Sequence, residues 1–485
     1  MTATTDGASA ASTREARLLT GEGWEAGEAG EEPVLDKYRL QPAGTVHLAS
    51  TRQAGRMVDI AARAFAAGAP VAHARGDALA RAAAIVAARR QDFVDLMIVE
   101  AGFTGADANG EVTRCIETLR LSGEEARRLA GEIIPVEGAP GQTGRTAFTL
   151  RVPIGIVAAI TPFNSPLNTV AHKVAPAFAA GNAVIVKPAS GTPLTACLLA
   201  EVLLEAGVPS GFVSVLHGRR EATSVLLGDQ RIRFFAFTGS TGTGRLIQAA
   251  AGLRRTQMEL GSIACTIVND DADLDRALPR IVDAGYRKAG QVCTSVQMLL
   301  VHDSRRAEVE ERLTPMVSAL RYGDPADPQT AVGPVISEPE ARRIEAWVDE
   351  AVAHGGRRLA GGERRGAVVP PTLLADVTAR MKVGCEEIFG PVVNVVPFST
   401  LDEAIARVNA TPYGLAAGIF TGRLADAFIA ARRLQVGGVH VNETSSARVD
   451  MMPYGGSKDS GFGREGPHYA IREMTEERVV SISGY

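Results

Sequence analysis

The run RFFAFTGSTGTGRLIQAAA, residues 233–251, decides the fold because a glycine-rich turn joins a strand pattern to a helix pattern. A β-prone aromatic stretch precedes Gly239, Gly242 and Gly244, and an apolar-periodic stretch follows them. The turn of a strand–turn–helix unit presents backbone N–H groups at a positive helix end, where phosphate binds. The glycine spacing differs from G-x-G-x-x-G, so spacing alone does not distinguish a dinucleotide site from an ordinary turn.

Strand and helix patterns alternate on both sides of this turn. The upstream stretches are IGIVAAIT (154–161), NTVAHKVAPAFAAG (168–181), AVIVKPA (183–189), TACLLAEVLLEAG (195–207) and FVSVLHG (212–218). This alternation is typical of βαβ units and predicts a doubly wound parallel sheet. Beyond Glu259 the strand patterns resume, so a second α/β domain is expected. Those later stretches are TIVND (266–270), VQMLLVH (296–302), VVNVVPF (392–398) and GGVHVN (437–442).

Other segments have patterns that do not belong to these sheets. Residues 51–130 carry apolar residues at three- and four-residue spacing, which predicts three helices. Residues 132–152 are β-rich around a turn with Gly and Pro, which predicts a hairpin that leaves its domain. The final VVSISGY (479–485) predicts one more strand, and residues 1–35 are expected to form a flexible tail.

The composition is that of a folded protein. Of 485 residues, 46% are hydrophobic and 22% are charged, which indicates a large core rather than disorder. A net charge of -4 with both signs scattered argues against a nucleic-acid surface. Apolar runs are shorter than the roughly 18 residues of a membrane span, and no secretory signal begins the chain, so a cytoplasmic protein without a membrane partner is expected. The five cysteines lack a C-x-x-C pair, which argues against disulfides and a metal site but leaves a catalytic thiol open.

Three residues have side chains suited to acyl chemistry. Cys293, in AGQVCTSVQ, lies in a loop before a strand, where a thiol can act as a nucleophile, although most cysteines are buried and inert. Glu259, in MELGS, would have a raised pKa if buried and would then suit a general base; the alternative is a solvated carboxylate. Asn164, in ITPFNSPLN, can donate to an oxyanion, although Asn is also a common turn residue.

Two charged residues lie next to predicted strands. Lys187 ends AVIVK at the carboxyl edge of the sheet, where a lysine can hold ribose or phosphate; the alternative is a solvated lysine. Glu387, in GCEEIFGPVV, precedes a strand and can bind a sugar hydroxyl. Neither residue identifies a site by itself.

Taken together, seven ordered stretches resemble the aldehyde dehydrogenase superfamily over roughly residues 50–485. They are ITPFNSP, AVIVKPAS, FTGSTGTG, MELGS, GQVCTS, EEIFGPV and PYGGSKDSGFGREG. The resemblance implies an α/β fold with two doubly wound parallel-sheet domains and a small β oligomerisation element, hence a homodimer or homotetramer. The implied dinucleotide-binding domain is 36–131 and 153–256, the catalytic domain is 257–464, and the oligomerisation element is 132–152 and 465–485.

The resemblance also implies roles for individual residues. Cys293 would attack an aldehyde, Glu259 would activate the water that hydrolyses the resulting thioester, and Asn164 with the N–H of Cys293 would bind the oxyanion. The cofactor would be NAD or NADP. The implied cofactor-binding residues are Thr161, Lys187, Ser190, Gly239, Ser240, Gly244, Glu387 and Phe389, with Lys187 and Glu387 at ribose hydroxyls and Phe389 near the nicotinamide.

Two positions depart from the family pattern. Ser190 stands three residues after Lys187, where many members have a glutamate that binds the adenosine 2'-hydroxyl. Without that carboxylate a 2'-phosphate meets less repulsion, and Arg219 or Arg220 would attract it, so dual or NADP-leaning use is the hypothesis. Ser262 replaces a second glycine, from which only a local effect is expected.

The substrate pattern is similar to one branch of the family. NGEVTRCIETLR, FNSPLNTVAHK and SSARVDMMPYGG resemble the lactaldehyde, phosphonoacetaldehyde and non-phosphorylating glyceraldehyde-3-phosphate dehydrogenases, which implies a small polar or anionic aldehyde. Arg114, Asn168 and Arg448 are the candidate substrate residues, because guanidinium groups bind anions through paired hydrogen bonds. The alternative for Arg114 is a helix-face ion pair, and Val292 beside Cys293 departs from the phosphonate-binding pattern.

Two other functions stay open from the sequence. In a CoA-acylating aldehyde dehydrogenase a thiol rather than water resolves the thioester, and Glu259 argues against it. The other is a catalytically silent binding protein with the same fold.

Overall fold

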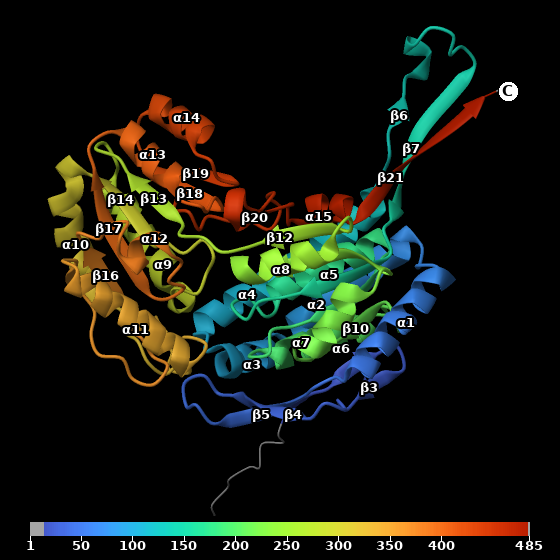
Figure 1. Ribbon diagram of the computed structural model, residues 1–485, viewed down its shortest axis with the longest axis horizontal. Coiled ribbons are helices and arrows are strands. Elements are labelled where there is room, and N and C mark those ends of the chain that lie inside the picture. The colour runs from blue at the N-terminus through green and yellow to red at the C-terminus, as the bar shows by residue number, and fades with distance from the viewer. Residues whose placement is uncertain (1–13, 484–485) are drawn as a thin grey trace, which may run out of the picture.

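The computed structural model describes residues 14–483 and consists of two α/β lobes and a projecting β arm (Figure 1). The first lobe contains most of residues 14–260, and residues 263–442 build the second. The arm rises from the first lobe and ends at the C-terminus. This arrangement confirms the predicted fold class. Within residues 14–483, none of the helices is long and apolar enough to cross a membrane.

The first lobe contains an eight-stranded sheet among the described residues, and its five central strands are parallel. The order is β20 (Gly461–Phe462), β12 (Arg255–Glu259), β11 (Ile232–Thr238), β8 (Ile156–Ile160), β9 (Ala183–Lys187), β10 (Val213–Val215), β2 (Leu18–Thr20) and β3 (Gly23–Glu25). The edge strands β20, β2 and β3 pair antiparallel. The continuous apolar runs of β8 and β9 are buried, as a parallel sheet requires.

The helices that pack against this sheet differ from the prediction at one place. They are α1 (Thr51–Ala67), α2 (Ala72–Ala88), α3 (Arg90–Ala101), α4 (Gly105–Arg128), α5 (Asn168–Ala180), α6 (Pro193–Glu205), α7 (Arg220–Gly228), α8 (Thr241–Ala251) and α15 (Pro467–Glu473). Residues 51–130 form four helices, not three, because Arg89, with φ −96° and ψ 22°, ends α2 and begins α3. Neither Gly nor Pro marks this break, so the apolar pattern does not reveal it.

The second lobe contains a seven-stranded sheet within the described residues, with only the edge strand β15 antiparallel. The order is β15 (Arg357–Ala360), β16 (Thr372–Ala375), β17 (Val392–Phe398), β14 (Met298–His302), β13 (Cys265–Val268), β18 (Ala416–Phe420) and β19 (Gly438–Val441). The helices are α9 (Leu274–Tyr286), α10 (Arg306–Ser318), α11 (Glu338–Ala353), α12 (Lys382–Cys385), α13 (Leu401–Ala410) and α14 (Leu424–Arg433). One apolar cluster packs α9 to α11 on the sheet, and another packs α13 and α14 on it.

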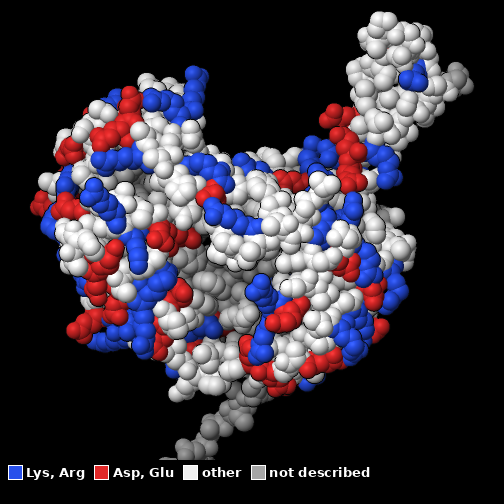
Figure 2. Space-filling view, viewed as in Figure 1, with Lys and Arg blue, Asp and Glu red and all other residues white. Residues whose placement is uncertain are grey.

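The arm is a three-stranded antiparallel sheet in the described chain. β21 (Thr475–Ser483) pairs along its whole length with β7 (Arg145–Pro153), and β6 (Ile133–Ile134) pairs with the other edge of β7. The predicted hairpin and C-terminal strand are therefore present. The predicted second segment of this element, 465–485, begins too early, because α15 packs against α4 and α5 in the first lobe. Figure 2 shows few charged side chains on the outer part of the arm.

The prediction of a flexible tail is wrong for residues 14–35. β1 (Arg14–Ala16) and β4 (Glu31–Leu35) flank β5 (Pro42–His47) in a separate three-stranded sheet, and β2 joins the main sheet where Leu19 pairs with Val215. β1 and β2 have three residues each, too few for a periodic pattern to be detected. Residues 1–13 lie outside the described residues.

Leu19→Ala is expected to lower the free energy of unfolding by about 2–5 kcal/mol, because Leu19 is buried in β2 and its truncation leaves a cavity. The midpoint of urea unfolding measures the loss. Leu253→Ala is the matched control, since Leu253 is fully exposed and its truncation should leave the midpoint nearly unchanged. Equal midpoints for the two variants would mean that β2 contributes nothing to the fold.

Candidate active site

A cavity of about 580 Å³ lies between the two lobes, and Figure 2 shows the molecule hollowed there. Eight residues singled out in the sequence line it: Thr161, Asn164, Gly239, Ser240, Glu259, Cys293, Glu387 and Phe389. Asn164 follows β8, Glu259 ends β12, and Cys293 precedes β14. Asn164 and Glu259 meet because parallel strands place their carboxyl ends at one edge of a sheet, and the loop before β14 brings Cys293 to them from the second lobe.

A strained turn presents Cys293 to this cavity. Lys288, Ala289 and Gly290 have positive φ values of 52°, 53° and 70°. A Cβ at Gly290 would lie 2.0 Å from the carbonyl oxygen of Gly390, so only glycine fits there. All five cysteines are free, and Cys293 is the one that lines the cavity.

The Cys293 sulfur has two polar neighbours. Its Sγ lies 2.8 Å from the hydroxyl oxygen of Tyr454, and that hydroxyl is 3.4 Å from Oε1 of Glu259. Burial, and then the negative charge of Glu259, raise the pKa of the Cys293 thiol well above its usual range. The sequence reasoning did not identify Tyr454, although it lies in the glycine motif PYGGSKDSG.

Glu259 is buried at the end of β12, with 4% of its surface exposed. Burial raises its pKa to about 7, and the nearby charge of Glu465 adds to this effect. The solvated-carboxylate alternative is therefore excluded. A carboxylate with this pKa is suited to accept a proton near neutral pH.

A buried carboxylate fixes Asn164 relative to Cys293. Glu111 of α4 accepts hydrogen bonds from Nζ of Lys288 at 2.8 Å, from the backbone N–H of Asn168 at 2.9 Å, and from the hydroxyl of Ser165. Lys288 also donates to the carbonyl oxygen of Asn164 at 3.1 Å. The Asn164 amide itself donates to the carbonyl oxygen of Gln291 at 2.8 Å, two residues before the nucleophile candidate. Glu111 and Lys288 thus hold both loops, and neither was predicted.

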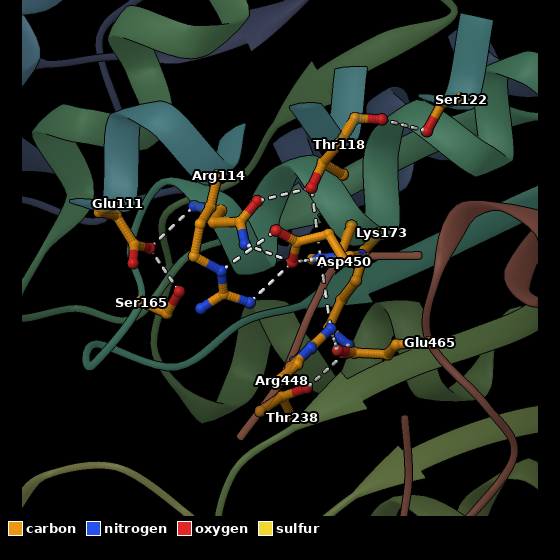
Figure 3. A network of polar contacts seen from close by, with 12 residues as sticks. Glu111, Arg114, Thr118, Ser122, Ser165, Lys173, Thr238, Arg448, Asp450 and Glu465 are labelled. Atoms are coloured by element: carbon orange, nitrogen blue, oxygen red, sulfur yellow. Dashed lines mark hydrogen bonds and ion pairs between the residues drawn. The ribbon is translucent and has the colours of Figure 1, made fainter. Parts of the chain in front are cut away.

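Two further buried carboxylates join the loop that follows the second lobe to helices α4 and α5 of the first lobe (Figure 3). Glu465 accepts from Lys173 of α5 and from Arg448, each at 3.0 Å, and Thr238 lies 3.3 Å from it. Although burial disfavours its charged form, Lys173 and Arg448 hold the pKa of Glu465 well below its usual range. Sequence reasoning missed Lys173 and Glu465, because nothing along the chain pairs residues so far apart.

Asp450 is the second of these carboxylates. Arg114 lies 2.7 Å from it, His172 lies 2.8 Å from it, and the Asn168 amide donates to it at 3.3 Å. Burial disfavours the charged form, but the bonds from His172 and Arg114 hold the pKa of Asp450 well below its usual range. The ion-pair interpretation of Arg114 is therefore correct, but the partner comes from the 448–452 loop rather than from its own helix.

A small second cavity of about 50 Å³ adjoins Cys293 on this side. Arg114, Arg287 and Arg448 line it, together with hydroxyl groups such as that of Ser446. Arg287 donates to the Ser446 hydroxyl at 2.6 Å and makes no ion pair within residues 14–483. Sequence reasoning missed Arg287, which stands six residues before Cys293. Asn168 is 1% exposed and lies outside this lining.

The larger cavity has the N-terminus of α8, a buried carboxylate and an aromatic pair on its wall. Ser240 caps α8, and its hydroxyl accepts from the N–H of Thr243. Glu387 accepts from the N–H of Ser262 at 2.8 Å, and burial raises its pKa to about 7. Phe389 meets Phe163 edge to face, with ring centroids 5.8 Å apart.

Other predicted cofactor residues do not line this cavity. A Cβ at Gly244 would lie 2.5 Å from Leu260, so this glycine lets α8 approach the sheet. Lys187 ends β9, where burial lowers its pKa, and Ser190 is exposed three residues later. Arg219 forms an ion pair with Glu32 at 2.6 Å.

Two lining residues carry no recognisable signal in the sequence. Glu340 and Arg343 of α11 face the cavity from the second lobe, and Arg343 donates to Glu340 at 2.8 Å. Among residues 14–483 no cluster of His, Cys, Asp or Glu is arranged to hold a metal ion.

Comparisons with known proteins agree on the family. The Aldehyde dehydrogenase family profile matches residues 24–480. The chain is 44% identical over 465 residues to the 3-sulfolactaldehyde dehydrogenase of Priestia aryabhattai, covering 95% of this chain and 96% of that protein. The structure of aldehyde dehydrogenase 21 from Physcomitrella patens, in complex with the reaction product succinate, matches with a TM-score of 0.95 and 39% identity over 97% of this chain and 99% of that one.

A third comparison is another solved structure. The glyceraldehyde-3-phosphate dehydrogenase of Methanocaldococcus jannaschii, complexed with NADP, matches with a TM-score of 0.90 and 34% identity over 94% of this chain and all 100% of that one. These relatives agree with the branch that the sequence resembles. The chain therefore belongs to the aldehyde dehydrogenase family and is an aldehyde dehydrogenase.

Proposed function

We propose that this enzyme oxidises a small anionic aldehyde to its carboxylic acid, with Cys293 as nucleophile, Glu259 as general base and NAD or NADP as hydride acceptor. The observation that carries the proposal is the shared cavity, in which Cys293, Glu259 and Asn164 meet from three separate segments. Water rather than CoA resolves the thioester in this proposal, because a buried carboxylate lies beside the sulfur.

The first half of the reaction forms a thioester on Cys293. The ionised sulfur attacks the aldehyde carbon and gives a tetrahedral thiohemiacetal. The Asn164 amide, turned from the Gln291 carbonyl that it now contacts, and the N–H of Cys293 stabilise the oxyanion. A nicotinamide dinucleotide bound in the larger cavity supplies the hydride acceptor.

The residues present fit such a dinucleotide. The glycine turn before α8 and the positive helix end suit a pyrophosphate. Glu387 can accept a hydrogen bond from a ribose hydroxyl, and the edge-to-face pair of Phe389 and Phe163 offers an apolar wall for the nicotinamide ring. Thr161 and Lys187 complete the proposed site from the ends of β8 and β9.

The second half of the reaction releases the acid. Glu259 accepts a proton from water, the water oxygen attacks the thioester carbon, and the sulfur leaves as the acid forms. The pKa of about 7 supports this role, because at neutral pH about half of the carboxylate is ready to accept a proton. The base form prevails above pH 7 and is lost below it.

The cofactor preference is proposed to include NADP. Ser190 brings no carboxylate to the place where a 2'-phosphate would lie, and Lys187 is a cation at the same loop. Arg219 is held by Glu32, whereas Arg220 makes no ion pair among the described residues. The matched structure from Methanocaldococcus jannaschii is complexed with NADP, which agrees with this proposal.

The substrate is proposed to carry one negative charge. Arg114 and Arg448 line the small cavity but are already paired with Asp450 and Glu465, whereas Arg287 has no carboxylate partner among the described residues. A carboxylate or sulfonate of the substrate would pair with the Arg287 guanidinium. A relative is named for 3-sulfolactaldehyde, and the aldehyde dehydrogenase 21 structure holds succinate.

The arm is proposed to join copies of the chain. It projects from the first lobe and exposes apolar side chains, namely Ile133, Leu150, Val479 and Ile482. Apolar surface of this kind on a projecting sheet is typical of subunit contacts, so we propose a homodimer or homotetramer. The five cysteines are free, which supports the proposal that the enzyme is located in the reducing cytoplasm.

Glu259→Gln is expected to leave a burst of about one reduced cofactor per active site and to lower steady-state turnover by about 10²–10⁴-fold, because the thioester forms but is not hydrolysed. Stopped-flow absorbance of the reduced nicotinamide measures both the burst and the turnover.

In the unchanged enzyme, the rate of single-turnover thioester hydrolysis should rise about fivefold from pH 6 to pH 7, and Glu259→Gln should lose this rise. Cys293→Ala should give neither burst nor turnover; residual oxidation by it would contradict the proposed nucleophile.

Ser190→Glu is expected to lower kcat/KM for NADP at least about tenfold while changing kcat/KM for NAD little, because the new carboxylate repels a 2'-phosphate. Initial rates with each cofactor measure the ratio. Ser318→Glu, at an exposed position at the end of α10, is the matched control. A strong NAD preference of the unchanged enzyme would refute NADP use.

Arg287→Leu is expected to raise KM for an aldehyde with a carboxylate or sulfonate tail on the order of 10–100-fold, because a charge-assisted hydrogen bond is lost. KM for a neutral aldehyde of similar size should change little. Arg276→Leu, which removes an exposed arginine of α9, is the control. Equal changes for charged and neutral aldehydes would argue against an anion site at Arg287.

A further inference from the structure

Tyr454 contacts the sulfur of the nucleophile candidate, and no sequence argument assigned it a role. It lies in the segment between Asp450 and the final glycine motif, and its ring is partly buried against the small cavity. Its hydroxyl oxygen lies 2.8 Å from Sγ of Cys293, a hydrogen-bond distance for oxygen and sulfur. The same hydroxyl oxygen lies 3.4 Å from Oε1 of Glu259.

The ring of Tyr454 is held in place from the other side. The guanidinium carbon of Arg448 lies 3.8 Å from the ring centroid, in the geometry of a cation–π contact. Arg448 is itself fixed by Glu465 at 3.0 Å and lies 3.2 Å from Nε2 of His172. A positive charge over the ring makes a phenol a stronger hydrogen-bond donor, because it favours the electron density that develops on the phenol oxygen.

The Cys293 sulfur needs such a donor. It is half-buried and lies near the carboxylate of Glu259, and both conditions disfavour a negative charge on sulfur. In this half of the cavity Arg114, Arg448 and Lys288 are already paired with carboxylates, and Arg287 donates to the Ser446 hydroxyl. The Tyr454 hydroxyl is the polar hydrogen that directly contacts the sulfur in the described residues.

We propose that Tyr454 activates Cys293: its hydroxyl, oriented by the stacked Arg448, donates a hydrogen bond that stabilises the thiolate. On ionisation the sulfur loses its proton to solvent, while the hydroxyl keeps its own proton and directs it at the sulfur. Once the sulfur has become a thioester it is a weak acceptor, and the hydroxyl is free to donate to Glu259. Tyr454 therefore contacts the reacting atom in the first half-reaction and the base in the second. This inference rests on the proposed role of Cys293 as nucleophile.

The test titrates the sulfur itself. Full-length enzyme is alkylated with iodoacetamide at pH values from 6 to 10, and the Cys293 peptide is followed by mass spectrometry. Tyr454→Phe keeps the ring and its contact with Arg448 but removes the hydroxyl. We expect the pH profile of alkylation to move upward by about one unit and the rate at pH 7 to fall about tenfold. Tyr322→Phe, which removes an exposed hydroxyl away from both cavities, should leave the profile unchanged.

A second variant tests the direction of the shift in the alkylation profile, and it does not require Tyr454→Phe to fold. A fluorinated tyrosine introduced only at position 454 is a more acidic donor of nearly the same shape, so the alkylation profile should move downward. An unchanged profile in either substituted enzyme, or a shift of opposite sign, overturns the proposal. Because alkylation needs no aldehyde or cofactor, this result is independent of the catalytic mechanism. Aldehyde oxidation by Cys293→Ala would overturn the nucleophile assignment. The alkylation profiles of Cys293 in the Tyr454 variants would still be interpretable in that case.

Discussion

The structure depends on a buried carboxylate between helix α5 of the first lobe and the loop that follows the second lobe. Glu465 lies between Lys173 of the first lobe and Arg448, with all three side chains largely removed from water. A buried charge without a partner is strongly unfavourable, and removal of one partner from such a pair typically costs about 3–5 kcal/mol. The two segments that carry these charges must therefore stay together. Because Arg448 also stacks on Tyr454, the same constraint fixes the wall of the cavity beside Cys293.

The electrostatics of the site follow from this arrangement. Two cations keep Glu465 ionised, and its negative charge, added to burial, raises the pKa of Glu259 to about 7. The same negative surroundings oppose a thiolate at Cys293. The two candidate groups therefore have conflicting requirements. Glu259 works best as a base with negative neighbours, whereas a thiolate at Cys293 needs a hydrogen-bond donor. The Tyr454 hydroxyl, within hydrogen-bond distance of both, is placed where this conflict arises.

A second buried ion pair, Lys288 with Glu111, controls the positions of the Asn164 and Cys293 loops. Lys288 adopts a left-handed conformation that an unsupported residue other than glycine rarely holds, and its ammonium group is bound to Glu111. Glu111 in turn accepts from the loop that carries Asn164. One carboxylate on α4 thus fixes the distance between Asn164, the proposed oxyanion donor, and Cys293, the proposed nucleophile, which lie on different lobes. Preorganisation of this kind is what catalysis by oriented dipoles requires.

The sequence by itself determined the two parallel-sheet domains and the arm, because these depend on local strand and helix patterns. Its seven ordered stretches also indicated the family and, through that resemblance, the meeting of Asn164, Glu259 and Cys293. It did not reveal the ordered strands of residues 14–35, which are too short for periodicity, or the break at Arg89, which no Gly or Pro marks. Tyr454, Arg287, Glu111 and Glu465 became visible only in the tertiary structure. Their roles come from partners up to hundreds of residues away, and burial and pairing of charges are properties of the folded neighbourhood rather than of the chain.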